Sequence, residues 1–385
     1  MLKKWRKSEG YQTFISSLIC IGLGLLAGLI VLLIINPAHG FEGIGSIVIS
    51  FLKYKNPLTS LNKFGNVIVK TVPLILCSLS IIFAYKVGFF NIGAAGQYVV
   101  GSACALYPIL AWHWPWWAGV ILAILGGLIY GVIVGLLKSY FNVNEVISGI
   151  MLNWIALYCA NMLLGRVKEV GSPYTVSIAN TNKDGLIPSL GLGYLFNKNK
   201  YVTIAIVLTI LIAIAIYIIL EKTKFGYELK ATGYNKFAAK YCGMKETKNT
   251  ILTFAIAGAL AGLAGAFFYL SGFENWQTSA SSVPAMGFNG IAAAFLGGLN
   301  PIGSIFSSYF ITHITLGGSY LDKSYYCSQI SDLITGIIIY FCGFSAFFTT
   351  LLNKKKKSDV PNANDENKDK KETKDVKKSE VGGDK

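Results

Sequence analysis

Long apolar runs constrain this chain more than any other feature of its sequence. Several of them reach about 20 residues, the length that an α-helix needs to cross the roughly 30 Å hydrocarbon core of a bilayer. Of the 385 residues, 53% are hydrophobic and only 14% are charged, and the mean hydropathy is +0.53. A β-barrel would instead show short segments of alternating polarity. The sequence therefore predicts an all-α fold, a polytopic transmembrane helical bundle of about 8–10 membrane segments.

The predicted spans account for most of the chain. They are expected at 14–35, 67–85, 92–111, 116–137, 146–164, 201–220, 251–270 and 329–352. The stretch 288–317 holds two shorter apolar segments on either side of Leu299-Asn300-Pro301. Irregular backbone at membrane depth is tolerated where protein or a water-filled cavity surrounds it. We therefore expect short or broken helices in this stretch, and again near 89–102, where glycines cluster between apolar runs.

Small residues recur at four-residue spacing in two of these spans. The first series is Gly127, Gly131 and Gly135, and the second is Gly258 and Gly262. Residues four apart lie on one face of a helix, and small side chains there let two helix backbones approach closely. The spacing indicates a compact bundle and carries no functional information by itself.

The net charge of +15 comes from lysines beside the predicted spans and in the C-terminal tail. Cytoplasmic flanks of membrane helices are enriched in Lys and Arg, so this charge indicates membrane orientation and argues against nucleic acid as a partner. The rule places both termini and the segment 221–250 in the cytoplasm of a multi-pass protein of the cell membrane. Lys354–Lys357 are expected to contact anionic membrane lipid.

The chain divides into four segments on this interpretation. Residues 1–13 form a cytoplasmic N-terminus, 14–352 the transmembrane domain, 221–250 a cytoplasmic loop within that domain, and 353–385 a lysine-rich tail. The tail has almost nothing apolar to bury, so it is expected to be disordered. A signal peptide has an apolar core of about 7–15 residues, and the first apolar run is longer than that. An uncleaved first span is therefore favoured.

Signatures of catalysis and metal binding are missing from the sequence. There is no Walker A phosphate loop and no H-E-x-x-H motif, and the three histidines, His39, His113 and His313, are far apart. Charged residues inside the predicted spans are few, and no series of acids crosses the membrane as many ion-coupled carriers require. We therefore expect a chain that is not an enzyme and that binds no metal or cofactor itself.

Uncharged polar residues stand out against this apolar background. Asn91, Gln97, Asn153 and Asn289 lie in or beside predicted helices, and Gly93 interrupts the apolar pattern at the start of one of them. A buried amide needs a hydrogen-bond partner, which is another helix, water or a ligand. These five residues are candidates to line a path for an uncharged, hydrogen-bonding solute. The alternative is that their amides only join helices to each other.

The cytoplasmic loop contains a second candidate feature, FGYELKATGYNKFAAKYCGMK at 225–245. Asn235 is a favoured N-cap for a short helix at 236–242, and Gly243 can end that helix. We expect this helix either to dock into a groove on another protein or to lie on the lipid surface. One face of it would carry Phe237, Ala238 and Tyr241.

Four segments occur in the order seen in the membrane permeases of ABC importers. They are FFNIGAAGQYVVGS, NEVISGIMLNWIALY, ATGYNKFAAKYCGM and GFNGIAAAFLGGLNPIGSI. Across roughly residues 65–350, the chain resembles the nucleoside and simple-sugar branch of the branched-chain amino-acid and ribose-type permeases. The pattern N-I-G-x-x-G-Q followed by E-V-x-x-x-x-M-L-N is most similar to the nucleoside branch.

The resemblance implies a transport subunit that works with other proteins. These are a second homologous permease, a subunit that binds ATP and Mg²⁺ and hydrolyses the ATP, and an extracellular substrate-binding lipoprotein. In such importers the short cytoplasmic helix is a coupling helix that rests in a cleft of the ATPase. The family pattern G-x-N-x-x-A-A-x-Y-x-G gives this role to Asn235, Ala238, Ala239, Tyr241 and Gly243. The expected function is inward transport of nucleosides.

Several other functions compete with this one. Within the same class, the solute is alternatively a monosaccharide or a branched-chain amino acid, although the predicted path offers little charge to meet the charged ends of an amino acid. An ion-coupled secondary carrier would move solute without a partner. A membrane enzyme or a scaffold is disfavoured because acids and histidines do not cluster within the predicted spans.

Overall fold

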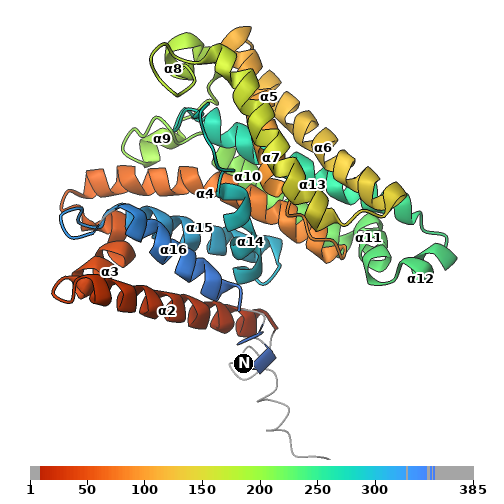
Figure 1. The fold of residues 1–385 in the computed structure, drawn as a ribbon, viewed down its shortest axis with the longest axis horizontal. Coiled ribbons are helices and arrows are strands. Elements are labelled where there is room, and N and C mark those ends of the chain that lie inside the picture. The colour runs from red at the N-terminus through yellow and green to blue at the C-terminus, as the bar shows by residue number, and fades with distance from the viewer. Residues whose placement is uncertain (1–8, 327, 345–346, 349, 352–385) are drawn as a thin grey trace, which may run out of the picture.

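The computed structural model describes residues 9–326, 328–344, 347–348 and 350–351, which fold mainly into helices (Figure 1). The helices are α2 (Glu9–Ile35), α3 (Gly40–Ile49), α4 (Pro57–Lys86), α5 (Ala94–Ala111), α6 (Trp116–Phe141), α7 (Glu145–Leu164), α8 (Ile178–Thr181), α9 (Leu192–Leu195), α10 (Ala205–Lys222), α11 (Lys224–Tyr234), α12 (Lys236–Tyr241), α13 (Glu246–Tyr269), α14 (Met286–Leu296), α15 (Pro301–Gly318) and α16 (Ser328–Cys342). Short 3₁₀ turns occur at η1 (Ser50–Lys53), η2 (Gly165–Val167) and η3 (Lys183–Gly185). Within the described residues, 7 helices are long and apolar enough to cross a membrane. The prediction of a polytopic helical bundle is confirmed.

Three helices form the centre of the bundle. α4, α5 and α13 are largely buried, whereas α2, α6, α7 and α10 leave most of their apolar length exposed. Helices that are apolar on every side are typical of membrane spans. α6 shows this most clearly, because exposed apolar side chains follow one another at three- and four-residue spacing along it: Trp117, Ile121, Leu125, Ile129, Ile133 and Leu136.

The two predicted glycine series pack against each other. α13 packs along α6, and a Cβ atom on Gly127 of α6 would lie 2.9 Å from the Cα atom of Gly262 on α13. A Cβ atom on Gly131 would overlap the carbonyl oxygen of Phe254 and lie 3.3 Å from the Cα atom of Gly258. The two backbones approach this closely because these positions carry no side chain. The compact packing predicted from the glycine spacing is confirmed.

A second layer of helices covers one side of α4. α14 and α15 pack on α4, and α2 packs along α16. Figure 1 shows α2 and α16 side by side at the lower edge, with α4 between this layer and α5, α6 and α7. His313 of α15 donates a hydrogen bond from Nε2 to the carbonyl of Val48 at 2.9 Å, which ties α15 to α3.

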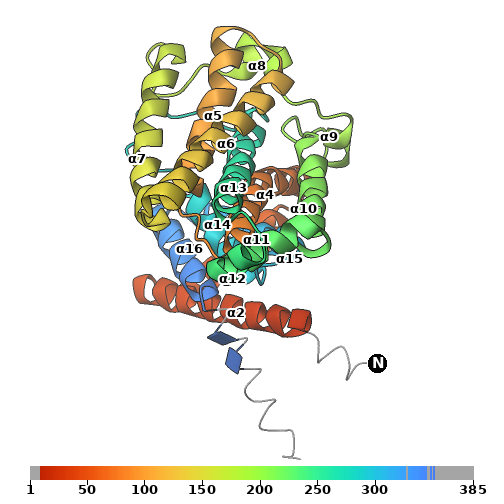
Figure 2. The same ribbon diagram turned by 90° about the vertical axis from the view of Figure 1, so that its right-hand side faces the viewer.

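Four short helices lie in two pairs at opposite ends of the bundle. α8 and α9 lie at one end, named here the α8 end, and α11 and α12 lie at the other, named the α12 end (Figure 1). Figure 2 looks directly onto the α12 end. At the α8 end, Trp276 Nε1 donates to Asn161 Oδ1 at 2.9 Å, and Thr175 N donates to Trp276 O at 2.9 Å. These bonds fix the loop after α7 against the segment after α13.

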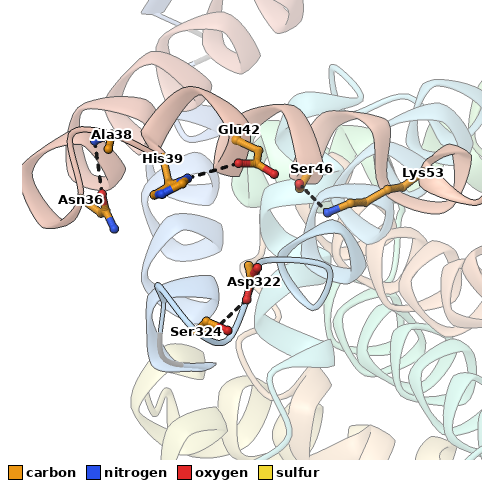
Figure 3. A network of polar contacts seen from close by, with 8 residues as sticks. All are labelled: Asn36, Ala38, His39, Glu42, Ser46, Lys53, Asp322 and Ser324. Atoms are coloured by element: carbon orange, nitrogen blue, oxygen red, sulfur yellow. Dashed lines mark hydrogen bonds and ion pairs between the residues drawn. The ribbon is translucent and has the colours of Figure 1, made fainter.

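Polar contacts order the connections of the second layer at the α8 end (Figure 3). His39, just before α3, lies 3.3 Å from the carboxylate of Glu42. In the connection between α15 and α16, the backbone N–H of Ser324 donates to Asp322 at 2.8 Å. This bond lowers the pKa of the Asp322 carboxyl below its ordinary value.

Both predicted broken segments are present in the structure. α4 ends at Lys86 and α5 begins at Ala94, while α14 ends at Leu296 and α15 begins at Pro301. Between α14 and α15, the side chain of Asn300 accepts a hydrogen bond from Ile302 N at 2.9 Å and so caps α15.

Most predicted span limits lie within five residues of the helix ends in the structure, and two differ by about ten. α4 begins at Pro57 instead of residue 67, because Asn56 accepts a hydrogen bond from Leu58 N at 3.0 Å and proline is favoured at the first helical position. α16 ends at Cys342, before a turn at Gly343, whereas the predicted span continued to residue 352. The predicted tail 353–385 and residues 1–8 of the predicted N-terminus lie outside the described residues.

Candidate functional site

The connection between α4 and α5, residues 87–93, is the first candidate feature and is named here the break. α4 ends because Gly88 adopts a left-handed conformation with φ of 83°. The N–H groups of Gly88 and Phe89 donate to the carbonyls of Tyr85 and Ala84, both at 3.0 Å. This arrangement satisfies the last carbonyls of a helix and is a common way for glycine to end one. The chain can therefore change direction within the bundle.

Asn91 joins the helices on both sides of the break. Its Nδ2 atom donates to Ser80 Oγ of α4 at 3.0 Å and to Gln97 Oε1 of α5 at 2.8 Å. Asn91 and Gln97 are 1% and 0% exposed. The two predicted residues therefore contact each other inside the protein and do not line an open cavity in this conformation.

Asn153 of α7 holds the start of α5. Its Oδ1 atom accepts a hydrogen bond from Gly96 N at 2.7 Å, and its Nδ2 atom donates to the carbonyl of Ile92 at 3.1 Å. The first N–H groups of a helix have no partner within that helix, so Asn153 supplies one from a neighbouring helix. The close approach of α7 requires small residues, since a Cβ atom on Gly149 would lie 2.9 Å from Gly93 N.

Two polar atoms of this group remain without a partner among the described residues. They are Asn91 Oδ1 and Gln97 Nε2. A Cβ atom on Gly93 would lie 3.4 Å from Asn91 Oδ1 and 3.7 Å from Gln97 Nε2. Both unpaired atoms therefore lie next to Gly93. If both amides were turned over, the free donor and acceptor would change places, and one of each would remain. The site thus presents one donor and one acceptor in an uncharged environment.

Asn289 lies apart from this hydrogen-bonded group. It is half-buried on α14, and none of the bonds described above involves it. Its neighbours Gly287 and Gly290 let α14 pack closely on α5 and α4. A Cβ atom on Gly287 would lie 2.5 Å from the Cα atom of Ala95 at the start of α5, and a Cβ atom on Gly290 would lie 2.9 Å from Cys77 Cβ in the middle of α4. The structure therefore brings together four of the five predicted path residues.

The helix predicted in the 221–250 loop is the second candidate feature. α12 follows Asn235, whose side chain accepts from Ala238 N at 3.0 Å, and it ends before Gly243, which has φ of 80°. Ala239 is 3% exposed, whereas Tyr241 is 93% exposed, and Ala238 is also exposed. The predicted cap and end of this helix are confirmed, and the side chains predicted to share one face, Phe237, Ala238 and Tyr241, are all exposed.

The two candidate features contact each other directly. Gly233, near the end of α11, lies against the break so closely that a Cβ atom would overlap the carbonyl oxygen of Val87 and lie 2.9 Å from Gly88 N. Lys236 Nζ lies 5.7 Å from the ring centroid of Phe89, within the range of a cation–π contact. The α11–α12 segment is therefore in direct contact with the connection that carries Asn91.

Two charged side chains of the spans are paired with opposite charges. Lys70 of α4 lies 2.7 Å from Glu274, and Lys138 of α6 lies 2.8 Å from Glu145 of α7. The hydrogen-bonding group at the break contains only uncharged side chains. In the described part of the chain, no three His, Cys, Asp or Glu side chains gather closely enough to hold a metal ion.

Sequence reasoning missed two residues of this site. Ser80 accepts a hydrogen bond from Asn91, and Gly149 permits the contact between α7 and the break. Ser80 is one of several small hydroxyl residues in an apolar run, so its sequence context gives no signal. Gly149 precedes Asn153 by four residues and shares a helix face with it, and this spacing is a signal that could have identified it.

Comparison with known proteins identifies relatives along most of the chain. The family described as "Branched-chain amino acid transport system / permease component" matches residues 64–343. The guanosine ABC transporter permease protein NupP of Bacillus subtilis (strain 168) is 32% identical over 88% of this chain and 96% of its own length. The nucleoside ABC transporter permease protein NupB of Lactococcus lactis subsp. cremoris (strain MG1363) is 29% identical over 88% of this chain and 93% of its own.

A further relative comes from the same Bacillus strain as NupP. The guanosine ABC transporter permease protein NupQ is 25% identical over 63% of this chain and 78% of its own length. No solved structure matches the chain. The family match, residues 64–343, includes the break, α7, the α11–α12 segment and α14. This chain therefore belongs to the permease family described as the permease component of the branched-chain amino acid transport system.

Proposed function

We propose that this chain is the membrane-spanning permease subunit of an ATP-driven importer that moves nucleosides into the cell. The observation that carries the proposal is the contact between the α11–α12 segment and the break, because it joins an exposed docking helix to a buried, uncharged polar group. The solute class is supported by relatives named as guanosine and nucleoside permeases, one of them 32% identical over 88% of this chain.

The solute path in this proposal runs past Asn91, Gly93, Gln97, Asn153 and Asn289. Asn91 and Gln97 offer one free acceptor and one free donor beside Gly93. Nucleobase edges carry neighbouring donors and acceptors, so a base can satisfy both atoms at once. The group is buried here, so the path is closed in this conformation and opens when α7 withdraws from the start of α5.

The force that opens the path comes from outside this chain. The exposed aromatic side chains Tyr234, Phe237 and Tyr241 of the α11–α12 segment form a surface suited to a groove on the ATP-binding subunit. ATP and Mg²⁺ are bound there. Closure of that subunit would move α12 and, through Gly233, the break. The coupling residues are Asn235, Ala238, Ala239, Tyr241 and Gly243.

Membrane orientation and the remaining partners complete the proposal. The lysines of the 221–250 segment support a cytoplasmic position for the α12 end, with both termini on the same side. A second permease subunit forms the other half of the path, which is supported by the two guanosine permeases named NupP and NupQ in one Bacillus strain. An extracellular substrate-binding lipoprotein delivers the solute to the α8 end.

The description of the family favours a branched-chain amino acid as the second candidate solute. An amino acid carries an ammonium and a carboxylate, and burying either group without a partner is costly. The group around Asn91 offers no charged side chain to pair with them. The geometry therefore favours a neutral solute.

Competition for uptake tests the solute class. The chain is co-expressed with its ATP-binding subunit, second permease and binding lipoprotein in a host that lacks nucleoside uptake, and entry of radiolabelled guanosine is measured. We expect unlabelled nucleosides to compete, excess glucose, ribose and leucine to have no effect, and a hydrolysis-deficient ATPase to abolish entry. Competition by leucine or by a sugar, without competition by nucleosides, would contradict the proposal.

A further inference from the structure

A cavity of about 640 Å³ lies at the α12 end, outside the features described so far. It is bounded by the end of α6 at Tyr140, by Lys240 of α12, and by the first turns of α13. This volume falls within the range of about 300–1,000 Å³ that is typical of ligand sites. The cavity belongs neither to the break nor to the exposed aromatic surface of α12.

The rim of the cavity is strongly basic. Lys240, Lys245 and Lys248 all line it, and all three are exposed. Among the described residues, none of them forms an ion pair. One carboxylate, that of Glu246, also lines the cavity, so the lining keeps a positive balance. A ligand with a negatively charged head is therefore favoured.

The backbone adds to this preference. α13 begins at Glu246, and no side chain caps its first turn. The first N–H groups of a helix lack internal partners and carry partial positive charge, so they bind anions readily. The residues that form this first turn, Glu246, Thr247 and Lys248, all line the cavity.

The floor of the cavity is apolar, and it continues along α6. Ile251 and Leu252 of α13 form part of the lining. On α6, exposed Ile133 and Leu136 lead to Tyr140, which is 68% exposed. Tyrosine is favoured where a membrane helix leaves the hydrocarbon for the headgroup layer. An acyl chain can follow this exposed strip while a polar head occupies the cavity.

We propose that this cavity binds one anionic phospholipid, with its phosphate held by Lys245, Lys248 and the first N–H groups of α13, and with its acyl chain along α6. A free phosphate ion would use the basic rim but would gain nothing from Leu252. An acidic segment of the ATP-binding subunit would gain nothing from the α6 strip. A phospholipid contacts both the basic rim and the apolar strip of α6. Because the cavity lies at the end of a membrane span, phospholipid headgroups are available beside it. The proposal requires the membrane placement of the chain and does not require its transport activity.

Native mass spectrometry of the purified full-length chain tests this site. Phosphatidylglycerol and phosphatidylcholine with identical acyl chains are titrated onto the wild type, onto Lys245→Gln/Lys248→Gln, and onto the matched control Lys222→Gln/Lys224→Gln, which removes the same charge from the same end. We expect the wild type to bind phosphatidylglycerol more tightly than phosphatidylcholine. The cavity variant should bind phosphatidylglycerol about 25-fold more weakly, because each of the two lysines near an anionic headgroup contributes about fivefold. The control should change binding less than twofold.

Two further measurements distinguish a bound phospholipid from a bound phosphate ion or protein segment. Leu252→Ser keeps every lysine, and we expect it to weaken phosphatidylglycerol binding, as an apolar floor requires. Inorganic phosphate at millimolar concentration should not displace the lipid. Equal losses in both double variants, an unchanged affinity in Leu252→Ser, or displacement by phosphate would overturn the proposal. Unchanged lipid binding in the cavity variant, together with weaker association of the ATP-binding subunit, would show that the cavity receives that subunit instead. Matching melting temperatures establish that each variant is folded.

Discussion

Asn153 acts as the N-cap of a helix to which it does not belong. It lies on α7, yet its Oδ1 atom accepts from Gly96 N at 2.7 Å in the first turn of α5, where Gly93 has no side chain to do so. Its Nδ2 atom satisfies the carbonyl of Ile92. One amide therefore fixes both the end of the break and the distance between two helices.

Replacement of Asn153 tests this role through stability. Asn153→Leu leaves a buried N–H and a buried carbonyl without partners, which should lower the free energy of unfolding by about 1–3 kcal/mol. The readout is the apparent melting temperature of the purified chain in detergent. Asn289→Leu is the matched control, because Asn289 lies outside the hydrogen-bonded group. Equal melting temperatures for the two variants would contradict the capping role.

The free atoms of Asn91 and Gln97 provide a second test at this scale. Gln97→Met removes the partner of Asn91 Nδ2 together with the free donor, whereas Ser80→Ala removes the other partner of Asn91 Nδ2 and leaves the free pair intact. We expect Gln97→Met to reduce guanosine uptake at least fivefold more than Ser80→Ala, the equivalent of about 1 kcal/mol for one hydrogen bond. Equal uptake by the two variants, at equal expression, would argue that the amides only join helices.

The sequence identified the amides of this site but not their partners. Asn91, Gln97 and Asn153 stood out because amides are rare in apolar runs. The bond from Asn153 to Gly96 depends on how α7 packs against α5, and no local pattern encodes that contact. Ser80 was missed because a serine in a helix usually hydrogen-bonds to the backbone of its own helix, so its bond to Asn91 could not be expected from the sequence.

At the level of elements, the α11–α12 segment lies directly against the break. Gly233 is the point of contact, because its missing side chain lets α11 reach the backbone of Val87 and Gly88. Asn249 of α13 donates to Thr232 at 2.8 Å and holds α11 from the other side. The segment is thus fixed against two central helices, while its outer face remains exposed.

Gly233→Val tests transmission through this contact. The added side chain would displace α11 from the break, so we expect uptake to fall at least tenfold while ATP hydrolysis by the assembled transporter continues. Gly45→Val in α3 is the control, because a Cβ atom there meets nothing within 4 Å. Parallel loss of hydrolysis and uptake in Gly233→Val, or no loss of either, would contradict a coupling role.

The exposed aromatic face of α12 gives a separate prediction about assembly. Tyr241 is 93% exposed, and Tyr194 at the α8 end is 76% exposed. We expect Tyr241→Ser to weaken co-purification of the ATP-binding subunit without changing the melting temperature, because an exposed aromatic residue contributes to a partner and little to the fold. Tyr194→Ser should leave co-purification unchanged. If Tyr241→Ser co-purifies normally, α12 does not dock as proposed.

Element boundaries followed from the sequence wherever caps and hydropathy agreed. α12 was predicted within one residue because Asn235 and Gly243 mark its two ends. The start of α4 was missed because residues 57–66 are more polar than the span that follows. Hydropathy therefore placed the start of this helix at residue 67, ten residues after its true start at Pro57. Hydropathy measures suitability for the bilayer, whereas a helix extends as far as its capping allows.

In the molecule as a whole, the fold separates a buried centre from an exposed periphery. α4, α5 and α13 are mostly buried, and glycine contacts hold α6 against α13. The uncharged group lies where α4, α5 and α7 meet, and the α12 end connects to it through one short segment. This arrangement suits a subunit that is moved by another protein, since the described spans contain no series of acids to couple transport to an ion gradient.

Reconstitution into liposomes shows whether another protein must drive transport through this chain. Accumulation of radiolabelled guanosine is measured in vesicles containing this chain alone under an imposed proton or sodium gradient, and in vesicles containing the complete transporter with ATP. Our expectation is accumulation only in the second case, with its loss when ATP is replaced by a non-hydrolysable analogue. Accumulation against a gradient by the chain alone would contradict it.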